Sequence, residues 1–162
     1  MAIFDPEITA LAARVLQGCR AKGWRISTAE SCTGGLLSAA LTDIAGSSDV
    51  FERGFVTYSN EAKEALLGVS ADSLKTHGAV SEPVAAEMAT GALARAPVQI
   101  AISITGIAGP GGSEHKPEGR VCFGLAVKGD PVQMVTEEFG ALGRANVRRA
   151  ALVFALEMLL SM

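Results

Sequence analysis

The chain has 162 residues, of which 49% are hydrophobic and 19% charged, and its formal net charge is −3. This length predicts one domain, and the hydrophobic fraction supplies a substantial core and excludes a disordered chain. The mild acidity argues against a dedicated nucleic-acid-binding protein, which usually carries a basic stripe. Three scattered cysteines, no signal peptide and no membrane-length apolar run lead us to expect a cytoplasmic protein.

Alternating helix and strand signals occupy the first half of the chain. Asp5 before Pro6 is typical of a helix N-cap and first turn, and apolar residues at helical spacing continue until Gly23. The segments expected next are a strand over 25–30, a helix over 36–44, a strand over 51–58 and a helix over 61–67. Asn60 directly precedes the last of these helices and is expected to be its N-cap.

The second half ends in a strand hairpin and a long helix. Val98, Ile100, Ile102 and Ile104 alternate with small or polar residues, as in a strand. The other expected elements are helices over 71–76 and 81–95, strands over 121–127 and 132–139, and a final helix over 143–160. The final helix is apolar nearly all round, so it is either deeply buried or part of a subunit interface. Together these elements predict an α/β fold, a single-domain three-layer α/β/α sandwich (1–162) with a mixed sheet.

The segment 31–35 joins an expected strand to an expected helix. A helix N-terminus offers unpaired N–H groups and a positive dipole end, which suit a phosphate or an oxyanion. Gly34 and Gly35 would let the backbone approach a ligand closely. The alternative is a capped tight turn, with Ser31 or Thr33 as N-cap. Cys32 is a second candidate nucleophile here, although no sequence-near histidine or lysine marks it.

Lys63 is expected in the first turn of the helix that follows Asn60. The helix dipole disfavours a cation there, so its pKa should fall, and burial would lower it further. A neutral lysine is a competent general base for a serine hydroxyl. The alternative is an exposed lysine paired with a neighbouring glutamate. Tyr58 is the only tyrosine and belongs to the same segment. The alternative to a role in the site is a half-buried strand aromatic whose hydroxyl faces water.

A glycine-rich loop over 106–119 leaves the carboxyl end of the strongest strand, where ligands of open α/β sheets bind. It matches neither a P-loop nor a dinucleotide-binding fingerprint. Arg144 and Arg148 lie four residues apart and share a helix face, so they could clamp a phosphate or a carboxylate. The alternative is a solvated basic face that includes Arg149. The two histidines lack metal-ligand spacing to any Cys, Asp or Glu, so no metal site is expected.

Five motifs in this order resemble one family, the C-terminal domain of the CinA proteins, some of whose members are bacterial nicotinamide-nucleotide amidases. The motifs span nearly the whole chain and are Ala29-Glu30-Ser31-Cys32-Thr33-Gly34-Gly35, Val56-Thr57-Tyr58-Ser59-Asn60 with Lys63, Gly78-Ala79-Val80-Ser81, Thr105-Gly106-Ile107-Ala108-Gly109-Pro110-Gly111-Gly112, and Gly143-Arg144 with Val147-Arg148. The chain resembles the stand-alone form, without the molybdopterin-binding-like domain of longer members. It departs from the family pattern over 113–119.

The resemblance implies deamidation of nicotinamide mononucleotide to nicotinate mononucleotide and ammonia, in the recycling of pyridine nucleotides. An amide must then be attacked without histidine or metal, for which a serine–lysine pair is a natural route. Ser31 would attack the carboxamide carbon and Lys63 would take the proton. Tyr58 would orient Lys63 or relay the proton.

The same resemblance implies the substrate-binding residues. Backbone N–H groups of Thr33, Gly34 and Gly35 are the oxyanion-hole candidates. The ribose or the substrate body would lie against Asn60, Thr105, Gly106 and Gly109, and the phosphate against Arg144 and Arg148, across a dimer interface.

No cofactor, metal, nucleic acid or membrane is expected, and the partners are the small-molecule substrate and further copies of the chain, as a homodimer or a higher homo-oligomer. Two alternatives stay open: a non-catalytic nucleotide-binding module, which needs the glycine loops and arginines only, and a protein-interaction domain. Ammonia release separates the enzyme from the module.

Overall fold

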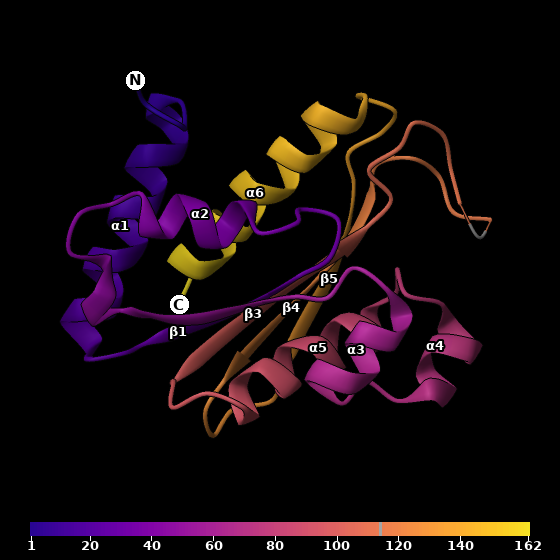
Figure 1. Cartoon of the computed structure of the whole chain (residues 1–162), viewed down its shortest axis with the longest axis horizontal. Helices are drawn as coiled ribbons and strands as arrows, with labels where there is room; N and C mark the ends of the chain where they lie inside the picture. The colour runs from indigo at the N-terminus through magenta and orange to yellow at the C-terminus, as the bar shows by residue number, and fades with distance from the viewer. Residues whose placement is uncertain (114) are drawn as a thin grey trace.

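A five-stranded mixed sheet forms the middle layer of the computed structural model, which describes residues 1–113 and 115–162 (Figure 1). The strand order is β2-β1-β3-β4-β5. Strand β1 pairs in parallel with β2 and with β3, whereas β4 pairs antiparallel with β3 and with β5. The strands are β1 (Ile26–Glu30), β2 (Phe51–Val56), β3 (Ile100–Gly106), β4 (Arg120–Val127) and β5 (Gln133–Glu138).

Helices cover both faces of this sheet, so the expected three-layer α/β/α arrangement is confirmed (Figure 1). One face carries α1 (Pro6–Lys22), α2 (Leu36–Thr42) and α6 (Arg144–Leu160), and the other carries α3 (Asn60–Leu67), α4 (Ala71–His77) and α5 (Glu82–Ala94). A 3-10 turn, Ser47–Asp49, precedes β2. Among the helices of the described residues, none combines the length and the apolar character that a bilayer crossing requires.

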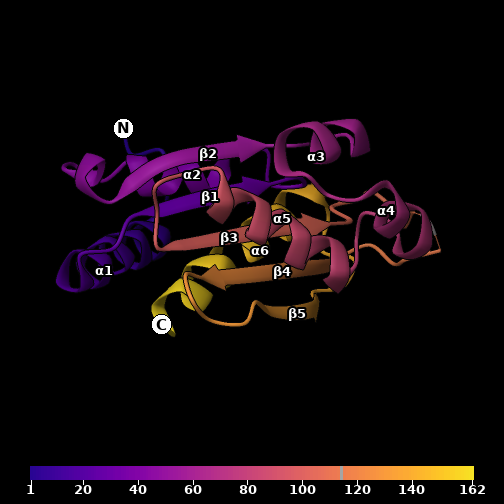
Figure 2. The same cartoon turned by 90° about the horizontal axis from the view of Figure 1, so that it is seen from below.

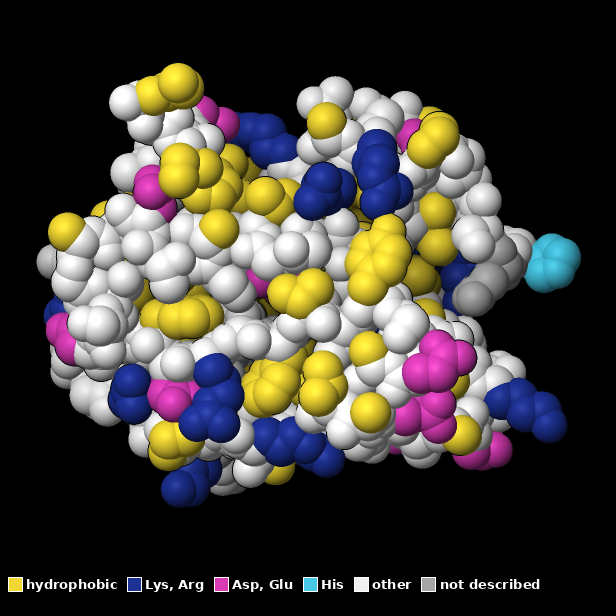
Figure 3. All heavy atoms as spheres, viewed as in Figure 1, with side chains coloured by type: hydrophobic (Ala, Val, Ile, Leu, Met, Phe, Trp, Pro, Cys, Tyr) yellow, Lys and Arg dark blue, Asp and Glu magenta, His cyan; other side chains and the backbone are white. Residues whose placement is uncertain are grey.

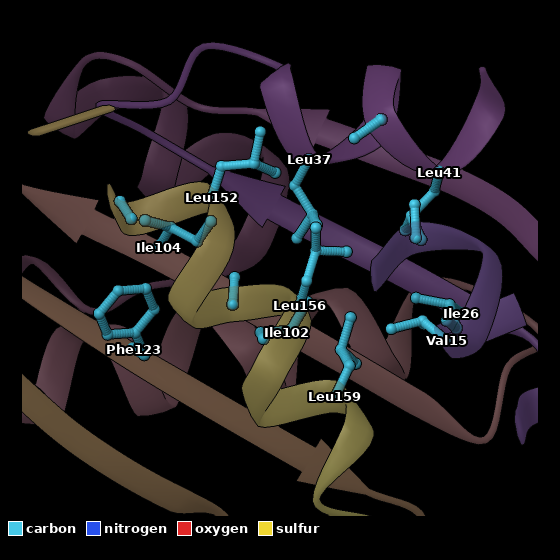
Figure 4. Close-up of a cluster of buried hydrophobic side chains, with 14 of the residues drawn as sticks. Val15, Ile26, Leu37, Leu41, Ile102, Ile104, Phe123, Leu152, Leu156 and Leu159 are labelled. Atoms are coloured by element: carbon cyan, nitrogen blue, oxygen red, sulfur yellow. The ribbon is translucent and has the colours of Figure 1, made fainter. Parts of the chain in front are cut away.

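The main core lies between the sheet and the helices α1, α2 and α6. The alternating residues Ile100, Ile102 and Ile104 of β3 all point to this core, which also contains Phe123 and Leu156 (Figure 4). Complete burial of one such side chain contributes about 1.5–3 kcal/mol. Because α6 packs against α1, α2 and the sheet, burial within the chain explains its apolar character.

The opposite face of the sheet is built from small residues, which lets α5 lie across β3 and β4 (Figure 2). The hydroxyl of Ser103 donates to the carbonyl oxygen of Ala85 at 2.6 Å. A side chain at Gly124 would overlap that same carbonyl. This close packing brings the segment before α5 to the end of β3, where the hydroxyl of Thr105 donates to the carbonyl oxygen of Ala79 at 2.9 Å.

The structure corrects two expectations at the start of α3. The N-cap is Ser59, whose hydroxyl accepts from the amide of Ala62 at 3.0 Å, and Asn60 is instead the first helical residue. Strand β2 ends at Val56, so Tyr58 lies in the loop before α3 rather than in a strand. The expected cap Asp5 is confirmed, since its side chain accepts the amide of Ile8, and Ser81 caps α5 in the same way.

Candidate active site

A pocket of about 340 Å³ lies at the carboxyl ends of β1 and β3, where open α/β sheets place their ligands. Its volume falls in the range of small-molecule sites, about 300–1,000 Å³. Its walls come from 31–32, the loop before α3, the segment 79–80, the glycine-rich loop and the start of α6. The sequence-derived candidates that line it are Ser31, Tyr58, Asn60, Lys63, Thr105, Gly106, Gly109 and Arg144.

Lys63 is a buried side chain, only 1% exposed, on the pocket wall. Its Nζ lies 3.0 Å from Ser31 Oγ, 2.9 Å from the carbonyl oxygen of Thr57 and 3.2 Å from that of Tyr58. The alternative of an exposed lysine is therefore wrong. The structure brings together two polar side chains that are 32 residues apart in the sequence.

Three oxygen atoms lie within hydrogen-bond distance of Lys63 Nζ, which fits an ammonium that donates to all three and also a neutral amine that accepts the Ser31 proton. A neutral lysine has two N–H donors and one lone pair, whereas an ammonium has three donors and no acceptor. The carbonyl oxygens of Thr57 and Tyr58 accept N–H groups of Lys63 in either state, and Ser31 Oγ accepts from the ammonium or donates to the neutral amine. Nucleophile–base pairs are recognised by this hydrogen-bond distance, about 2.6–3.2 Å.

Ser31 is held by its backbone in the turn between β1 and α2. Its amide donates to the carbonyl oxygen of Ile104 in β3 at 2.9 Å, and its own carbonyl accepts from the amide of Gly34 at 3.0 Å. Gly34 and Gly35 have φ values of 58° and 104°, in the left-handed region that favours glycine. The turn thus needs these glycines for its shape.

The neighbouring Cys32 is a poor nucleophile in this environment. Burial is the main cause that raises the pKa of its thiol to about 12. The reactive form of cysteine is the thiolate, which is scarce at neutral pH when the pKa is this high. Of the two adjacent candidates, Ser31 is the one whose side chain contacts Lys63 Nζ.

Glu30 is the residue that sequence reasoning missed. Neither Ser31 nor Thr33 caps α2, whose N-cap is Gly35 without a side-chain bond. The carboxylate of Glu30, 0% exposed, instead accepts from the first α2 amides, Leu37 at 2.9 Å and Ser38 at 3.0 Å. It also accepts from the hydroxyls of Thr33 and Ser38. The available signal was a carboxylate at the carboxyl end of the expected strand, directly before Ser31.

Tyr58 contributes its main chain to Lys63, while its phenol faces elsewhere. The carbonyl oxygen is the atom that contacts Lys63 Nζ, and the side chain is 62% exposed. The phenol hydroxyl accepts from Nη2 of Arg144 at 2.9 Å. Orientation of Lys63 by Tyr58 therefore comes from the backbone of the loop.

The three arginines at the start of α6 have different partners. Arg144 reaches the pocket, where its Nη1 donates to the carbonyl oxygen of Gly109 at 2.8 Å. Arg148, outside the pocket lining, donates from Nε to the carbonyl of Cys32 at 3.1 Å and from Nη2 to that of Thr33 at 3.3 Å. Arg149 pairs with acidic side chains of the α1 region. Basic side chains are visible over this end of α6 in Figure 3. Of the expected pair, Arg144 lines the pocket of this chain and Arg148 does not.

The expected oxyanion-hole residues lie just behind Ser31. Thr33, Gly34 and Gly35 are not among the residues that line the pocket. The amide of Gly34 donates to the carbonyl oxygen of Ser31, whereas that of Thr33 has no acceptor in the described part of the chain.

Within residues 1–113 and 115–162, no group of three or more His, Cys, Asp or Glu side chains is placed to hold a metal ion. Glu114, in the divergent loop segment, lies outside the described residues.

Comparison with known proteins places these residues in a family. The CinA C-terminal domain matches residues 8–162. This chain belongs to the CinA C-terminal domain family. The amidohydrolase class expected from the motifs is also the class of a relative, the "Nicotinamide-nucleotide amidohydrolase PncC" of Escherichia coli (strain K12), which is 52% identical over 96% of this chain and 94% of that protein.

Other members of the CinA C-terminal domain family extend the comparison. A "CinA-like protein" of Syntrophobacter fumaroxidans is 54% identical over 86% of this chain, which corresponds to 33% of that longer protein. The crystal structure of "competence/damage inducible protein CihA" from Agrobacterium tumefaciens superposes with a TM-score of 0.96 at 47% identity, covering 99% of this chain and 98% of that one. The fold expected from the sequence is thus the fold of the family.

Proposed function

We propose that this chain hydrolyses the carboxamide of nicotinamide mononucleotide, giving nicotinate mononucleotide and ammonia, in pyridine-nucleotide recycling. The observation that carries the proposal is the buried Lys63 Nζ, 3.0 Å from Ser31 Oγ on the wall of a pocket of about 340 Å³. The substrate comes from the name of the Escherichia coli relative, which matches nearly the whole chain.

In the proposed reaction, Ser31 Oγ attacks the carboxamide carbon while Lys63 Nζ takes the hydroxyl proton. The tetrahedral intermediate collapses when Lys63 returns this proton to the amide nitrogen, which leaves as ammonia. The acyl-enzyme ester is then attacked by water, whose proton passes through Lys63 to Ser31 Oγ as the acid is released. One water is consumed, and the enzyme returns to its starting state.

The remaining pocket residues position the substrate. The amide of Thr33, which has no acceptor among the described residues, is a candidate donor for the oxyanion. Asn60, Thr105 and the glycine-rich loop provide polar and backbone surface for the ribose. Arg144 is the charged side chain of the pocket available to a phosphate, since Arg148 is engaged behind the turn. We propose that the enzyme acts as a homo-oligomer in the cytoplasm, without a cofactor.

The direct test is to incubate the purified chain with nicotinamide mononucleotide and to measure ammonia and nicotinate mononucleotide. Equal amounts of both products are expected, released in proportion to enzyme. The nucleoside without phosphate serves as the second substrate. Binding of the mononucleotide with no release of either product would contradict the proposal and favour a non-catalytic nucleotide-binding module.

Replacing Arg144 with alanine should raise KM for the mononucleotide much more than KM for the nucleoside. The guanidinium can meet a phosphate with a charge-assisted hydrogen bond, for which the nucleoside has no partner. Steady-state kinetics with both substrates provide the measurement. An equal change for the two would mean that Arg144 acts through its bonds to Gly109 and Tyr58 instead.

A further inference from the structure

Side chains of opposite charge hold the turn that carries Ser31. The guanidinium of Arg148, half-buried on the second turn of α6, donates to the carbonyl oxygens of Cys32 and Thr33. The carboxylate of Glu30 accepts from the hydroxyl of Thr33 at 2.7 Å and from the first amides of α2. Arg148 therefore donates to carbonyl oxygens of the turn, and Glu30 accepts from hydroxyl and amide donors at its other side.

The contacts of Arg148 determine the directions of two peptide groups. A trans peptide is planar, with its C=O and N–H pointing to opposite sides. Because the carbonyl of Cys32 points to Arg148, the N–H of Thr33 points away from it, and the same relation holds for the carbonyl of Thr33 and the N–H of Gly34. The Gly34 amide then closes the turn on the carbonyl of Ser31 at 3.0 Å. The Thr33 amide has no acceptor in the described part of the chain.

Glu30 completes the same arrangement from inside the fold. A buried carboxylate is tolerated only when hydrogen bonds satisfy it, and its two oxygens here accept four, from Thr33, Leu37 and Ser38. These bonds join the end of β1 to the start of α2, so Ser31 sits between two fixed points. A charged acceptor makes such bonds stronger than a neutral one would.

We propose that Arg148 and Glu30 are positioning residues, which hold the Ser31 turn between them so that the nucleophile faces Lys63 and the Thr33 amide faces the developing oxyanion. This inference rests on the proposed function, in which Ser31 is the nucleophile. It assigns Arg148 to the chemical step rather than to the phosphate of the substrate.

The test compares Arg148→Ala with Arg149→Ala, which removes the same charge one residue further along α6. Arg149 contacts Asp5 and Glu7 and lies outside the pocket, so its variant should keep wild-type kinetics. Arg148→Ala should lower kcat about 10- to 100-fold, because a shift of about 1 Å in a reacting group can cost 100-fold. KM should stay within about twofold for the mononucleotide and the nucleoside alike, the signature of an interaction made in the transition state.

Two further measurements separate positioning from loss of fold. Added methylguanidine should restore part of the lost kcat of Arg148→Ala and leave Arg149→Ala unchanged. Arg148→Lys, which places one charge near one carbonyl, should give an intermediate kcat. Thermal melting of every variant reports folding, and Arg148→Lys serves as the test if Arg148→Ala does not fold.

The Glu30 side is tested with Thr33→Val, which keeps the side-chain shape and removes the hydroxyl that donates to the carboxylate. A lower kcat with an unchanged KM is expected, and a wild-type kcat would overturn this part of the inference. For Arg148, a raised KM for the mononucleotide with an unchanged kcat would overturn the inference and make it a phosphate ligand. Ser31→Ala is measured alongside: if that variant keeps its activity, the proposed function itself fails, whatever the arginine variants do.

Discussion

Replacement of Ser31 by alanine should abolish ammonia release and leave the fold in place. The substitution removes the oxygen that forms the acyl-enzyme bond, and loss of a catalytic serine can cost on the order of 10⁴-fold or more in kcat. The side chain is 8% exposed and does not cap α2, so the loss in stability is that of one hydrogen bond, about 1 kcal/mol. Ammonia assays and thermal melting provide the two measurements.

Ser27 offers a matched control for this variant. It lies on β1, the strand that leads into Ser31, is 0% exposed, and donates one hydrogen bond to the carbonyl of Ala92 at 3.0 Å, away from the pocket. Ser27→Ala should therefore lose similar stability and keep its activity. Wild-type ammonia release by Ser31→Ala would disprove the acyl-enzyme route and pass the attack to water or to Cys32.

The fold could be predicted from the sequence because the signals in it are local. Alternation in β3 and the capping residue Asp5 depend on neighbours a few positions away, and the structure confirms both. The start of α3 was harder, since Ser59 and Asn60 are adjacent and both are good N-caps. Only the direction of the Ser59 hydroxyl, which accepts from Ala62, distinguishes them.

The site was less predictable, because its contacts join residues far apart in the chain. The motifs pointed to Ser31 and Lys63, but the 3.0 Å between them depends on how β1 and α3 are placed by the sheet. Arg148 shows most clearly that sequence spacing does not predict side-chain partners. Its spacing from Arg144 predicts a shared helix face, yet the two guanidiniums, on long side chains, reach different backbone carbonyls. Helical periodicity determines the face of a residue and does not identify its partner.

Replacement of Lys63 by arginine should also nearly abolish activity, because a guanidinium stays protonated and cannot accept the Ser31 proton. A buried arginine needs more room than lysine, so Lys63→Met serves as a second variant of similar length that carries no proton acceptor of comparable strength. Lys75→Arg, on the exposed surface of α4, is the control and should keep wild-type rates. Loss of activity in both Lys63 variants, with melting curves that show folded protein, is the expected result.

The pH dependence of kcat/KM of the wild-type enzyme tests whether Lys63 acts as a base. Lys63 acts as a base only when neutral, so kcat/KM should rise with pH as the free enzyme loses that proton, and then level off. Burial at 1% exposure in the first turns of α3 favours the neutral amine, so we expect this limb below the pKa of about 10.4 of an exposed lysine. In the Lys63 variants the residual rate should lack this limb. Substantial activity of Lys63→Arg with an unchanged pH profile would exclude Lys63 as the base, because no group at that position could then titrate in the observed range.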